Sequence, residues 1–375
     1  MAPEAPLRLL YVVTEDWYFL SHRLPMARAA RDAGFEVHVA TRVADGAVAI
    51  AAEGFTLHPV PFVRGRLSPS GTIAAIRALN DIHRKVEPAI VHHVALQTTV
   101  LGSIAARGRP VVCVNALTGL GFAFTSGSAK ARLLRPVLSA LLRLLLNGPK
   151  QTVLIQNPDD RDGIRALGIA ADRIALIPGS GVDVEALRPM PEPASPITIA
   201  FVGRLLEDKG VHTLIRAHAR LRARGCSVEL LIAGTPDPAN PASVSEQQAR
   251  AWGQSPGITW LGHVDISTVW ARAHIAVLPS RREGLPMSLL EAAACGRPMI
   301  ATDVPGCREI VRPDQTGLLV PFDDDRALAD AIESLAQSQQ RRARYGAAAR
   351  RLVVERFSAA EIGRQTVDLY RSLTT

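Results

Sequence analysis

Two glutamates, Glu283 and Glu291, flank the predicted start of a helix that follows an apolar, strand-like run at 275–279. Glu283 lies in a charged turn, Pro286 is placed as the first helical residue, and Glu291 lies inside the helix. The neighbours of Glu291 are so apolar that this helix must be largely buried, and a buried carboxylate is costly unless something hydrogen-bonds to it. A ribose cis-diol can donate two hydroxyl protons to the two carboxylate oxygens.

The same helix start suits a phosphate. The backbone N–H groups of Gly284, Leu285 and Met287 would point out of the first turn, because they have no acceptor inside the helix. The structural alternative is that Glu283 is a solvated turn residue and that Glu291 pairs with a buried arginine. For either glutamate considered alone, that alternative is favoured.

Two cations strengthen the interpretation as a ligand site. A strand-like run at 197–203 ends in Gly203, and Arg204 and Lys209 follow before the next predicted helix. Two cations beside the amino terminus of a helix suit a diphosphate. The two stretches together therefore predict a site for a nucleoside diphosphate.

The Gly-Arg-x4-Lys-Gly element at 203–210, combined with Glu-x7-Glu at 283–291, resembles the donor-site signature of the retaining glycosyltransferases of family 4. The resemblance covers the C-terminal half of the chain well, including 261–263 and 317–322. In the N-terminal half, 114–121 is most similar to the branch that extends polyprenyl-diphosphate-linked sugars. The family has the GT-B fold, in which two Rossmann-like, doubly wound α/β domains face each other across a cleft.

This resemblance implies roles for the matching residues. Arg204 and Lys209 would stabilise the charge that develops on the leaving diphosphate, Glu291 would hold the ribose, and Glu283 would orient the donor sugar. In the family, the leaving phosphate assists the incoming hydroxyl on the same face of the sugar, so the configuration is retained. The other predicted donor-binding residues are Gly203, Gly234, His263, Gly284, Leu285 and Pro286.

The composition is that of a globular chain with anionic partners. With 375 residues, 47% of them hydrophobic, the chain is long enough for two domains with their own cores. The net charge of +8 and the pI near 9.8 admit nucleic acid, a phosphorylated substrate or an anionic membrane. Nucleic acid is disfavoured, because only 5% of residues are aromatic and no cationic run alternates with aromatic side chains.

The sequence predicts neither export nor a membrane span. Its four cysteines form no Cys-x-x-Cys pair, which is typical of reduced, cytosolic residues. The first residues lead directly into a strand-like run, without the cationic and apolar parts of a signal peptide. Uncharged apolar stretches stay shorter than the roughly 18 residues that a spanning helix needs. We therefore expect a cytoplasmic protein.

Strand-like runs alternate with helical periodicity along the chain, which predicts two mostly parallel, doubly wound sheets. We expect an N-terminal acceptor-binding domain at 1–180, a Pro- and Gly-rich linker at 181–196 and a C-terminal nucleotide-sugar-binding domain at 197–357. In the resembled fold the last helix, here 358–375, crosses back to the first domain. Strands are predicted at 7–13, 35–41, 55–60, 89–93, 110–115, 152–156 and 173–177, and then at 197–203, 228–234, 258–261, 275–279, 298–302 and 318–320.

Ligands of such sheets lie beyond the carboxyl ends of the strands, which directs attention to the loops of the first domain. After the first strand, His22 and Arg23 precede a predicted helix and can meet the diphosphate of an acceptor. The alternative is that Ser21 and His22 only cap that helix. The two interpretations are equally favoured.

A second group of acceptor-binding candidates follows the strand at 110–115. Asn115, Thr118 and Gly119 lie in a glycine-containing loop that lets a substrate approach closely. In many members of the family a histidine of this loop contacts the donor sugar, and here that role is unfilled or is taken by Asn115 or Thr118. His93, at the end of the preceding strand, is a catalytic candidate, although a histidine in that position is more often structural.

The segment 129–147 carries four cations on a leucine-rich background and predicts a basic amphipathic helix. Such a helix can lie in an anionic membrane surface, with cations among the headgroups and leucines below. The alternative is a helix that covers the sheet with its arginines in solvent. On the first interpretation the protein associates peripherally with the inner face of the cell membrane, and the cations are Lys130, Arg132, Arg135 and Arg143.

Two Asp-x-Asp matches, at 160–162 and 323–325, are the pattern with which other glycosyltransferases hold a divalent cation. Both precede or open predicted helices, so they are explained as helix caps and dipole partners. Since Arg204 and Lys209 can neutralise a diphosphate, we expect that no metal and no other cofactor is required.

Together these features predict a retaining transferase that moves a sugar from a nucleotide diphosphate donor, a UDP-sugar, to a lipid-diphosphate-linked sugar such as an undecaprenyl-diphosphate conjugate, in polysaccharide assembly. Two alternatives stay open. An epimerase of similar fold would use Glu15, Asp16, His22 and His93 as acids and bases and would need no acceptor. A non-catalytic protein would bind the nucleotide sugar without turnover.

Overall fold

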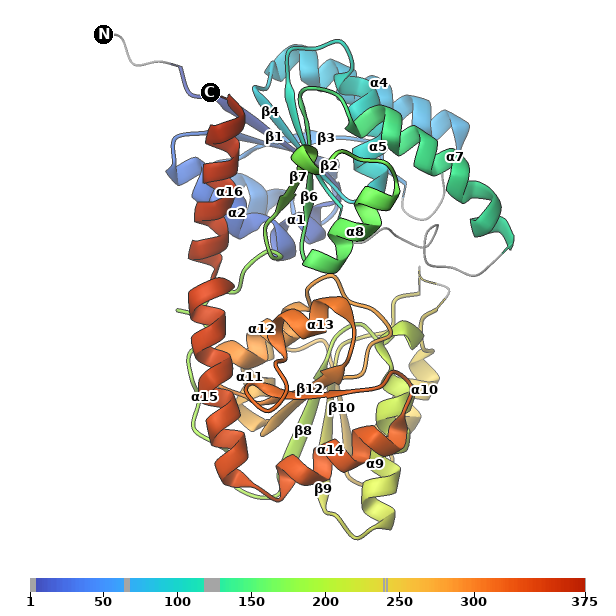
Figure 1. Ribbon diagram of the computed structural model, residues 1–375, viewed down its shortest axis with the longest axis vertical. Coiled ribbons are helices and arrows are strands. Elements are labelled where there is room, and N and C mark those ends of the chain that lie inside the picture. Colours follow the sequence, from blue (N-terminus) through green and yellow to red (C-terminus); the bar gives the residue numbers. More distant parts are fainter. Residues whose placement is uncertain (1–4, 64–67, 118–128, 239, 241, 375) are drawn as a thin grey trace. The chain divides into compact units, whose positions relative to one another are not determined.

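The computed structural model describes residues 5–63, 68–117, 129–238, 240 and 242–374. The chain divides into two compact units, the first made of residues 1–180 and 359–375 and the second of residues 181–358. Each unit is built on one sheet whose paired strands are parallel (Figure 1). The predicted fold class, α/β with two doubly wound sheets, is confirmed.

In the part of the chain that the structure describes, the first unit has a seven-stranded sheet in the order β3-β2-β1-β4-β5-β6-β7. Its strands are β1 (Arg8–Glu15), β2 (Glu36–Arg42), β3 (Thr56–Pro59), β4 (Ile90–Val94), β5 (Val112–Ala116), β6 (Gln151–Ile155) and β7 (Ile174–Leu176). Its helices are α1 (Asp16–His22), α2 (Leu24–Asp32), α3 (Ala47–Ala52), α4 (Pro69–Val86), α5 (Leu96–Ala106), α7 (Ala129–Leu146), α8 (Pro158–Ala166) and α16 (Ala359–Thr374).

The second unit has a six-stranded sheet in the order β10-β9-β8-β11-β12-β13, again within the described residues. Its strands are β8 (Ile197–Val202), β9 (Val228–Ala233), β10 (Ile258–Gly262), β11 (Ile275–Leu278), β12 (Met299–Thr302) and β13 (Gly317–Val320). Its helices are α9 (Val211–Ala223), α10 (Glu246–Gly253), α11 (Ile266–Arg272), α12 (Met287–Ala294), α13 (Pro305–Ile310), α14 (Asp325–Ala336) and α15 (Gln339–Arg356). Every predicted strand is present, with ends within two residues of those expected.

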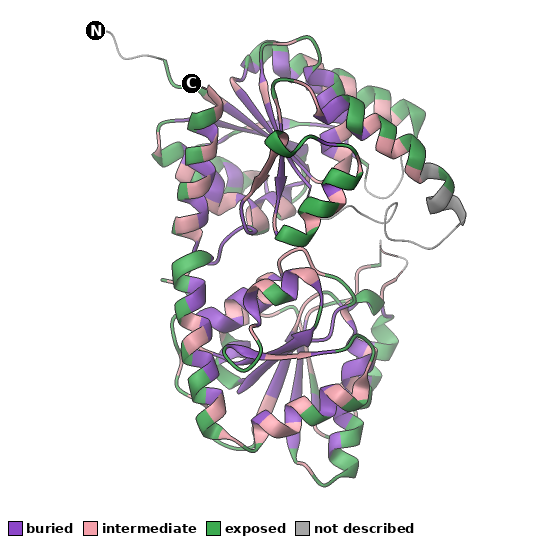
Figure 2. Ribbon diagram, viewed as in Figure 1, coloured by how far each residue is buried: buried purple, intermediate pink, exposed green. Residues whose placement is uncertain are grey.

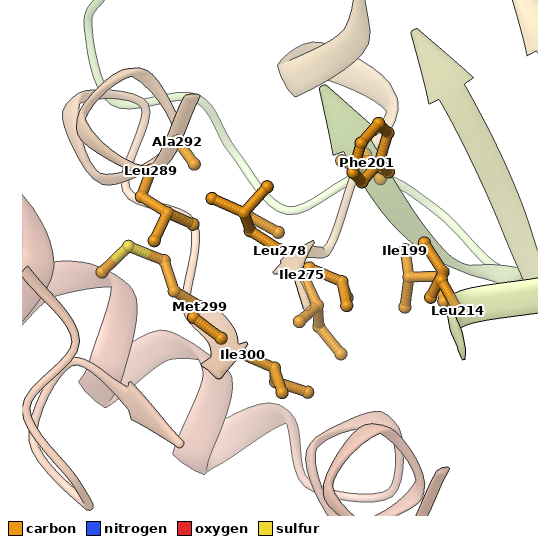
Figure 3. Packing of buried hydrophobic residues seen from close by; sticks show 14 of the residues in the cluster. Ile199, Phe201, Leu214, Ile275, Leu278, Leu289, Ala292, Met299 and Ile300 are labelled. Carbon is orange, nitrogen blue, oxygen red and sulfur yellow. The ribbon is translucent and has the colours of Figure 1, made fainter. Parts of the chain in front are cut away.

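The central strands are buried because helices cover both faces of each sheet, whereas the edge strands β3, β7, β10 and β13 are only partly buried (Figure 2). In the second unit, Leu289 and Ala292 of α12 lie beside Leu278 of β11 and Met299 of β12, as Figure 3 shows. This packing fixes the orientation of α12 about its own axis. The glutamate on that helix is therefore held in one direction.

The helix α16 completes the first unit, where it lies beside α2 (Figure 1). The Tyr370 hydroxyl of α16 lies 2.9 Å from the Tyr11 hydroxyl on β1 and 2.5 Å from Nδ1 of His92 on β4. Tyr11, His92 and Tyr370 are all fully buried. These polar contacts and the apolar face of α16 tie the helix to the sheet.

The segment 181–196, expected to be a linker, is counted with the second unit. Arg350 of α15 donates hydrogen bonds to the carbonyl groups of Val184 and Leu187, at 2.9 and 2.7 Å. Arg297 donates to the carbonyl group of Pro191 at 3.0 Å. The segment is therefore fastened to the surface of the unit by arginines.

Candidate donor site in the second unit

The loops that carry the predicted donor residues meet at the carboxyl edge of the second sheet. Strand β8 lies between β9 and β11, so the order of the strands reverses at this point. In open parallel sheets such a switch point leaves a crevice in which ligands bind. Arg204 and Lys209 follow β8 and Glu283 follows β11, which places the two motifs on the two sides of the switch point.

Lys209 and Glu283 form an ion pair across the switch point. The Nζ atom of Lys209 lies 2.6 Å from one carboxylate oxygen of Glu283 and 2.9 Å from the other. The Glu283 side chain is 8% exposed and the Lys209 side chain is 24% exposed, so the ammonium group is the more accessible partner. Glu283 is therefore not the solvated turn residue of the structural alternative.

Glycines let the segments around this ion pair approach each other. A Cβ atom at Gly210 would lie 2.0 Å from the carbonyl oxygen of Pro279, at the end of β11. A Cβ atom at Gly306 on α13 would lie 2.4 Å from the carbonyl oxygen of Gly284. Sequence reasoning missed Gly306, because its contact with the Glu283 turn comes from a helix that lies later in the chain.

The helix α12 begins at Met287, and Pro286 is its N-cap, with an extended backbone (φ −76°, ψ 116°). The prediction that Pro286 is the first helical residue is wrong by one position, because the φ that proline prefers suits both positions. In the described part of the chain, the N–H groups of Leu285 and Met287 have no backbone acceptor. They can donate to an anion at the helix start.

Glu291 of α12 forms no ion pair with any cation that the structure describes, so the expected alternative of a buried arginine partner is not found. The nearby Arg297 donates instead to the carbonyl groups of Trp270 and Pro191, at 2.9 and 3.0 Å. Burial raises the pKa of the Glu291 carboxyl to about 7. The group has acceptor capacity that a ligand hydroxyl can use.

Arg204 is half-exposed and pairs with a carboxylate that sequence reasoning did not select. Its Nη1 atom lies 2.9 Å from Oδ2 of Asp237, which lies in the proline-rich segment after β9. The Arg204 side chain is 48% exposed and the Asp237 side chain is 13% exposed. A signal was present in the sequence, since Asp237 follows the adjacent strand β9 just as Arg204 follows β8.

The remaining donor candidates lie at the ends of the neighbouring strands. Gly203 and Gly234 end the β8 and β9 runs, and a Cβ atom at Gly234 (φ 134°) would lie 1.9 Å from the carbonyl oxygen of Gly203. His263 follows β10 and is exposed. All predicted donor residues therefore lie at one edge of one sheet.

A cavity of about 510 Å³ lies at this edge, beside the ends of β9 and β10. Its lining includes Thr235, Pro238, Asn240, Ser243 and Trp260. A second cavity, of about 600 Å³, lies at the amino ends of β1 and β5 in the first unit. Parallel sheets bind ligands at the carboxyl ends of their strands, and the first of the two lies at that end. Its lining includes none of the predicted donor residues, so it neighbours the candidate site and does not coincide with it.

The structure does not support His93 as a catalytic residue or Asn115 as an acceptor-binding residue. Both side chains are fully buried inside the first sheet, and Nδ1 of His93 lies 2.8 Å from Oδ1 of Asn115. The Asn115 amide also donates to Gln151. Burial lowers the pKa of His93 to about 4, so the ring is neutral near pH 7. The structural interpretation holds for His93, because the strand continues past it to Val94.

His22 and Arg23 do not both face solvent. His22 ends α1 and stacks on Tyr18 with ring centroids 4.2 Å apart. Arg23, the N-cap of α2, is 1% exposed and is therefore too buried to meet a diphosphate from solvent. The capping alternative is also wrong, since no side chain caps α2. Of these two residues, His22 is the one whose side chain is partly exposed.

Thr118 and Gly119, the other acceptor candidates, lie outside the described residues.

Both Asp-x-Asp matches lie at helix starts, as expected. Asn157 caps α8 by accepting from the N–H group of Asp160, and Asp324 caps α14 by accepting from Arg326 and Ala327. The outer aspartates of the second match also pair with α9, where Asp323 accepts from Thr213 and Arg216 and Asp325 accepts from Arg220.

The sequence matches two glycosyltransferase domain families. Residues 8–157 match the family described as Glycosyl transferase 4-like, and residues 196–338 match Glycosyl transferases group 1. The chain is 29% identical to alpha-maltose-1-phosphate synthase of Mycolicibacterium smegmatis, over 90% of this chain and 91% of that protein. It is 25% identical to N,N'-diacetylbacillosaminyl-diphospho-undecaprenol alpha-1,3-N-acetylgalactosaminyltransferase of Campylobacter jejuni, over 86% of this chain and 90% of that protein.

A solved structure has the same fold. HepE of Anabaena, determined in complex with UDP and glucose, superimposes with a TM-score of 0.80 and 19% identity, over 98% of this chain and 100% of that one. This likeness shows that the chain has the two α/β domains of the GT-B fold. The chain therefore contains two glycosyltransferase domains, one of the 4-like type at residues 8–157 and one of the group 1 type at residues 196–338.

Proposed function

We propose that the protein is a retaining glycosyltransferase that transfers a sugar from a UDP-sugar to a sugar linked through diphosphate to a lipid. The observation that carries this proposal is the Lys209–Glu283 ion pair at the β8–β11 switch point, with Arg204 and Glu291 at the same edge of the sheet. The solved HepE complex with UDP and glucose supports a UDP-sugar as the donor.

The site can perform the main electrostatic task of the reaction. As the bond from the sugar to the diphosphate breaks, negative charge develops on the leaving oxygen, and Arg204 and Lys209 are cations placed to stabilise it. Glu291 accepts hydrogen bonds from the ribose hydroxyls. The N–H groups at the start of α12 donate hydrogen bonds to the nucleotide sugar. Glu283 holds Lys209 in place and orients the donor sugar.

The acceptor and the stereochemistry are proposed from the relatives. The Campylobacter relative is named for a sugar on diphospho-undecaprenol, and the Mycolicibacterium relative for a sugar phosphate. Both names describe α products, which an α-linked nucleotide sugar gives only by retention. We favour the lipid-linked acceptor because of an apolar stripe on α7.

Helix α7 exposes leucine and valine side chains along one face. Leu133, Val137 and Leu144 are 77%, 67% and 65% exposed, and their spacing places them on the same side of the helix. Arg143 beside them is exposed, and Arg135 is partly buried. No described helix is long and apolar enough to cross a bilayer. An apolar stripe with flanking cations fits the surface of an anionic membrane.

We expect the wild type to float with vesicles of phosphatidylglycerol and phosphatidylcholine. Leu133→Asp/Leu144→Asp should lose about tenfold or more in binding, because charges replace two exposed leucines that would enter the membrane. Val48→Asp on α3 is the matched control, since Val48 is 82% exposed in the same unit. Flotation at two salt concentrations checks the result. Equal flotation of all three proteins would contradict membrane binding by α7.

Activity is expected to survive a chelator, because Arg204 and Lys209 supply the positive charge that a metal would otherwise bring to the diphosphate. Turnover of UDP-sugars should be measured after dialysis against EDTA and again with added Mg²⁺ or Mn²⁺. Loss of activity that either cation restores would show that this part of the proposal is wrong.

The deciding experiment for the proposed function is turnover of UDP-sugars with lipid-diphosphate-linked and with soluble sugar-phosphate acceptors. Transfer to the lipid-linked acceptor supports the proposal, and transfer only to soluble acceptors overturns the proposed acceptor.

An epimerase would turn over without any acceptor. The structure disfavours that alternative, since Glu15 hydrogen-bonds to Arg42 and Asp16 accepts from the N–H groups of Ala44 and Gly46. Binding of UDP without turnover would indicate a non-catalytic protein.

A further inference from the structure

We propose that Asp237 is a positioning residue, whose carboxylate holds the Arg204 guanidinium so that its two parallel N–H groups can bind the donor diphosphate. The inference rests on the proposed function, because it concerns the same donor site. It adds a residue from the segment after β9, which neither motif contains.

The contact uses only one part of the guanidinium. Nη1 of Arg204 donates to Oδ2 of Asp237 at 2.9 Å. The Nε and Nη2 groups of Arg204 have no hydrogen-bond acceptor in the part of the chain that the structure describes. These two groups form the parallel pair of donors with which arginine binds phosphate oxygens in a bidentate manner. Asp237 therefore orients the guanidinium and leaves its phosphate-binding edge open.

The backbone of Asp237 is itself held in place. The N–H group of Asp237 donates to the Ser243 hydroxyl at 2.8 Å, and its carbonyl accepts from the N–H group of Asn240, also at 2.8 Å. At 13% exposed, the Asp237 side chain is less accessible than the arginine it contacts. The flexible arginine side chain is thus paired with a carboxylate that a fixed stretch of backbone carries.

The segment that carries Asp237 is joined to the loop between the two catalytic cations. The N–H group of Leu205 donates to the carbonyl of Thr235 at 3.1 Å, and that of Val244 donates to the carbonyl of Leu205 at 2.9 Å. The N–H group of Glu207 donates to the carbonyl of Ala242 at 2.9 Å. These backbone hydrogen bonds join the loop after Arg204 to the segment that contains Asp237. They therefore hold the two residues at a fixed separation.

The opposite interpretation is that Asp237 competes with the diphosphate for Arg204. Carboxylate and phosphate oxygens are both good acceptors for a guanidinium, so a competing carboxylate would weaken donor binding. The two interpretations predict opposite effects of removing the Asp237 carboxylate. Removal of a competitor tightens UDP binding, whereas removal of a positioning residue lets the long arginine side chain sample unproductive rotamers and lowers activity.

The test is a double-mutant cycle with Asp237→Ala, Arg204→Ala and the double variant, measured as kcat/KM for the UDP-sugar and as the Kd of UDP. We expect Asp237→Ala to lower kcat/KM about tenfold in the wild-type background and less than about twofold when Arg204 is already alanine, because the effect acts through that arginine. Asp237→Asn, whose amide oxygen still accepts from Nη1, should stay within about threefold of the wild type.

Asp330→Ala is the matched control, since Asp330 pairs with Arg224 at 2.6 Å on the surface of the same unit and should leave activity unchanged. Tighter UDP binding by Asp237→Ala, or equal effects of that change in both backgrounds, would overturn the proposal. If the wild type neither binds UDP nor turns over any UDP-sugar, the proposed function fails instead. Thermal denaturation of each variant separates loss of fold from loss of positioning.

Discussion

Replacing Lys209 by alanine is expected to lower kcat/KM for the UDP-sugar about a thousandfold. The change removes a cation from the leaving diphosphate, and loss of one preorganised donor of this kind costs about 10²–10³ in rate. It also leaves the Glu283 carboxylate, 8% exposed, without its partner and beside an anionic substrate. Breaking such a pair on one side costs about 3–5 kcal/mol when the pair is well buried, and less here, because the lysine is partly in water.

A second substitution separates these two effects. Lys209→Ala/Glu283→Gln should recover most of the lost thermal stability, because no unpaired charge is left, but should recover no activity, because the cation is still missing. Arg250→Ala is the control, since Arg250 makes an exposed i,i+4 pair with Glu246 on α10. If Lys209→Ala keeps wild-type kcat/KM, Lys209 is not part of the donor site.

Replacing Glu291 by glutamine is expected to weaken UDP binding about 10- to 100-fold at pH 8, and to make the protein without ligand more stable at that pH. The first effect follows because hydrogen bonds from the ribose to a charged acceptor contribute about 1.5–3 kcal/mol. The second follows because burial raises the pKa of this carboxyl from its ordinary value of 4.5 to about 7. The folded chain binds this proton more tightly than the unfolded chain, so stability falls as pH rises from about 4.5 to about 7.

Glutamine at position 291 does not ionise, so it removes this loss of folding stability, which amounts to about 1–3 kcal/mol above pH 7. In the wild type, UDP affinity should rise with pH between about 5 and 8, because the ligand prefers the ionised carboxylate and its binding releases a proton. Calorimetry in buffers of different ionisation enthalpy measures that proton, and denaturation at pH 5 and pH 8 measures the stability. The exposed Glu355→Gln on α15 is the control. A flat pH dependence in the wild type would show that Glu291 does not hold the ribose.

The sheets could be predicted from the sequence because apolar runs of four to eight residues, bounded by turn residues, are typical of buried strands. The donor candidates could be placed for a related reason. Arg204, Lys209 and Glu283 each follow a strand, and the carboxyl ends of parallel strands share one edge of the sheet. Position along the chain was enough to locate these side chains.

The errors arose where position along the chain is not enough. His93 and Asn115 lie in strands that are buried on both faces, so the sequence offers no alternation to show that their side chains face each other. Arg23 lies between two short helices, and its burial depends on how they pack. Gly306 approaches the site through a contact between distant segments, which a single sequence does not contain. Asp237 follows a strand as Arg204 does, but the sequence does not show that the two side chains pair.

The docking of α16 on the first sheet separates the order of synthesis from the order of folding. Residues 181–358 form a complete unit, and a ribosome makes all of them before it reaches Tyr370, which closes onto Tyr11 and His92. The unit begun first is therefore finished second. A nascent chain has to carry an incomplete first sheet, with the apolar surface beneath α16 open to water, while the second unit folds, and this interval is when chaperones are expected to bind.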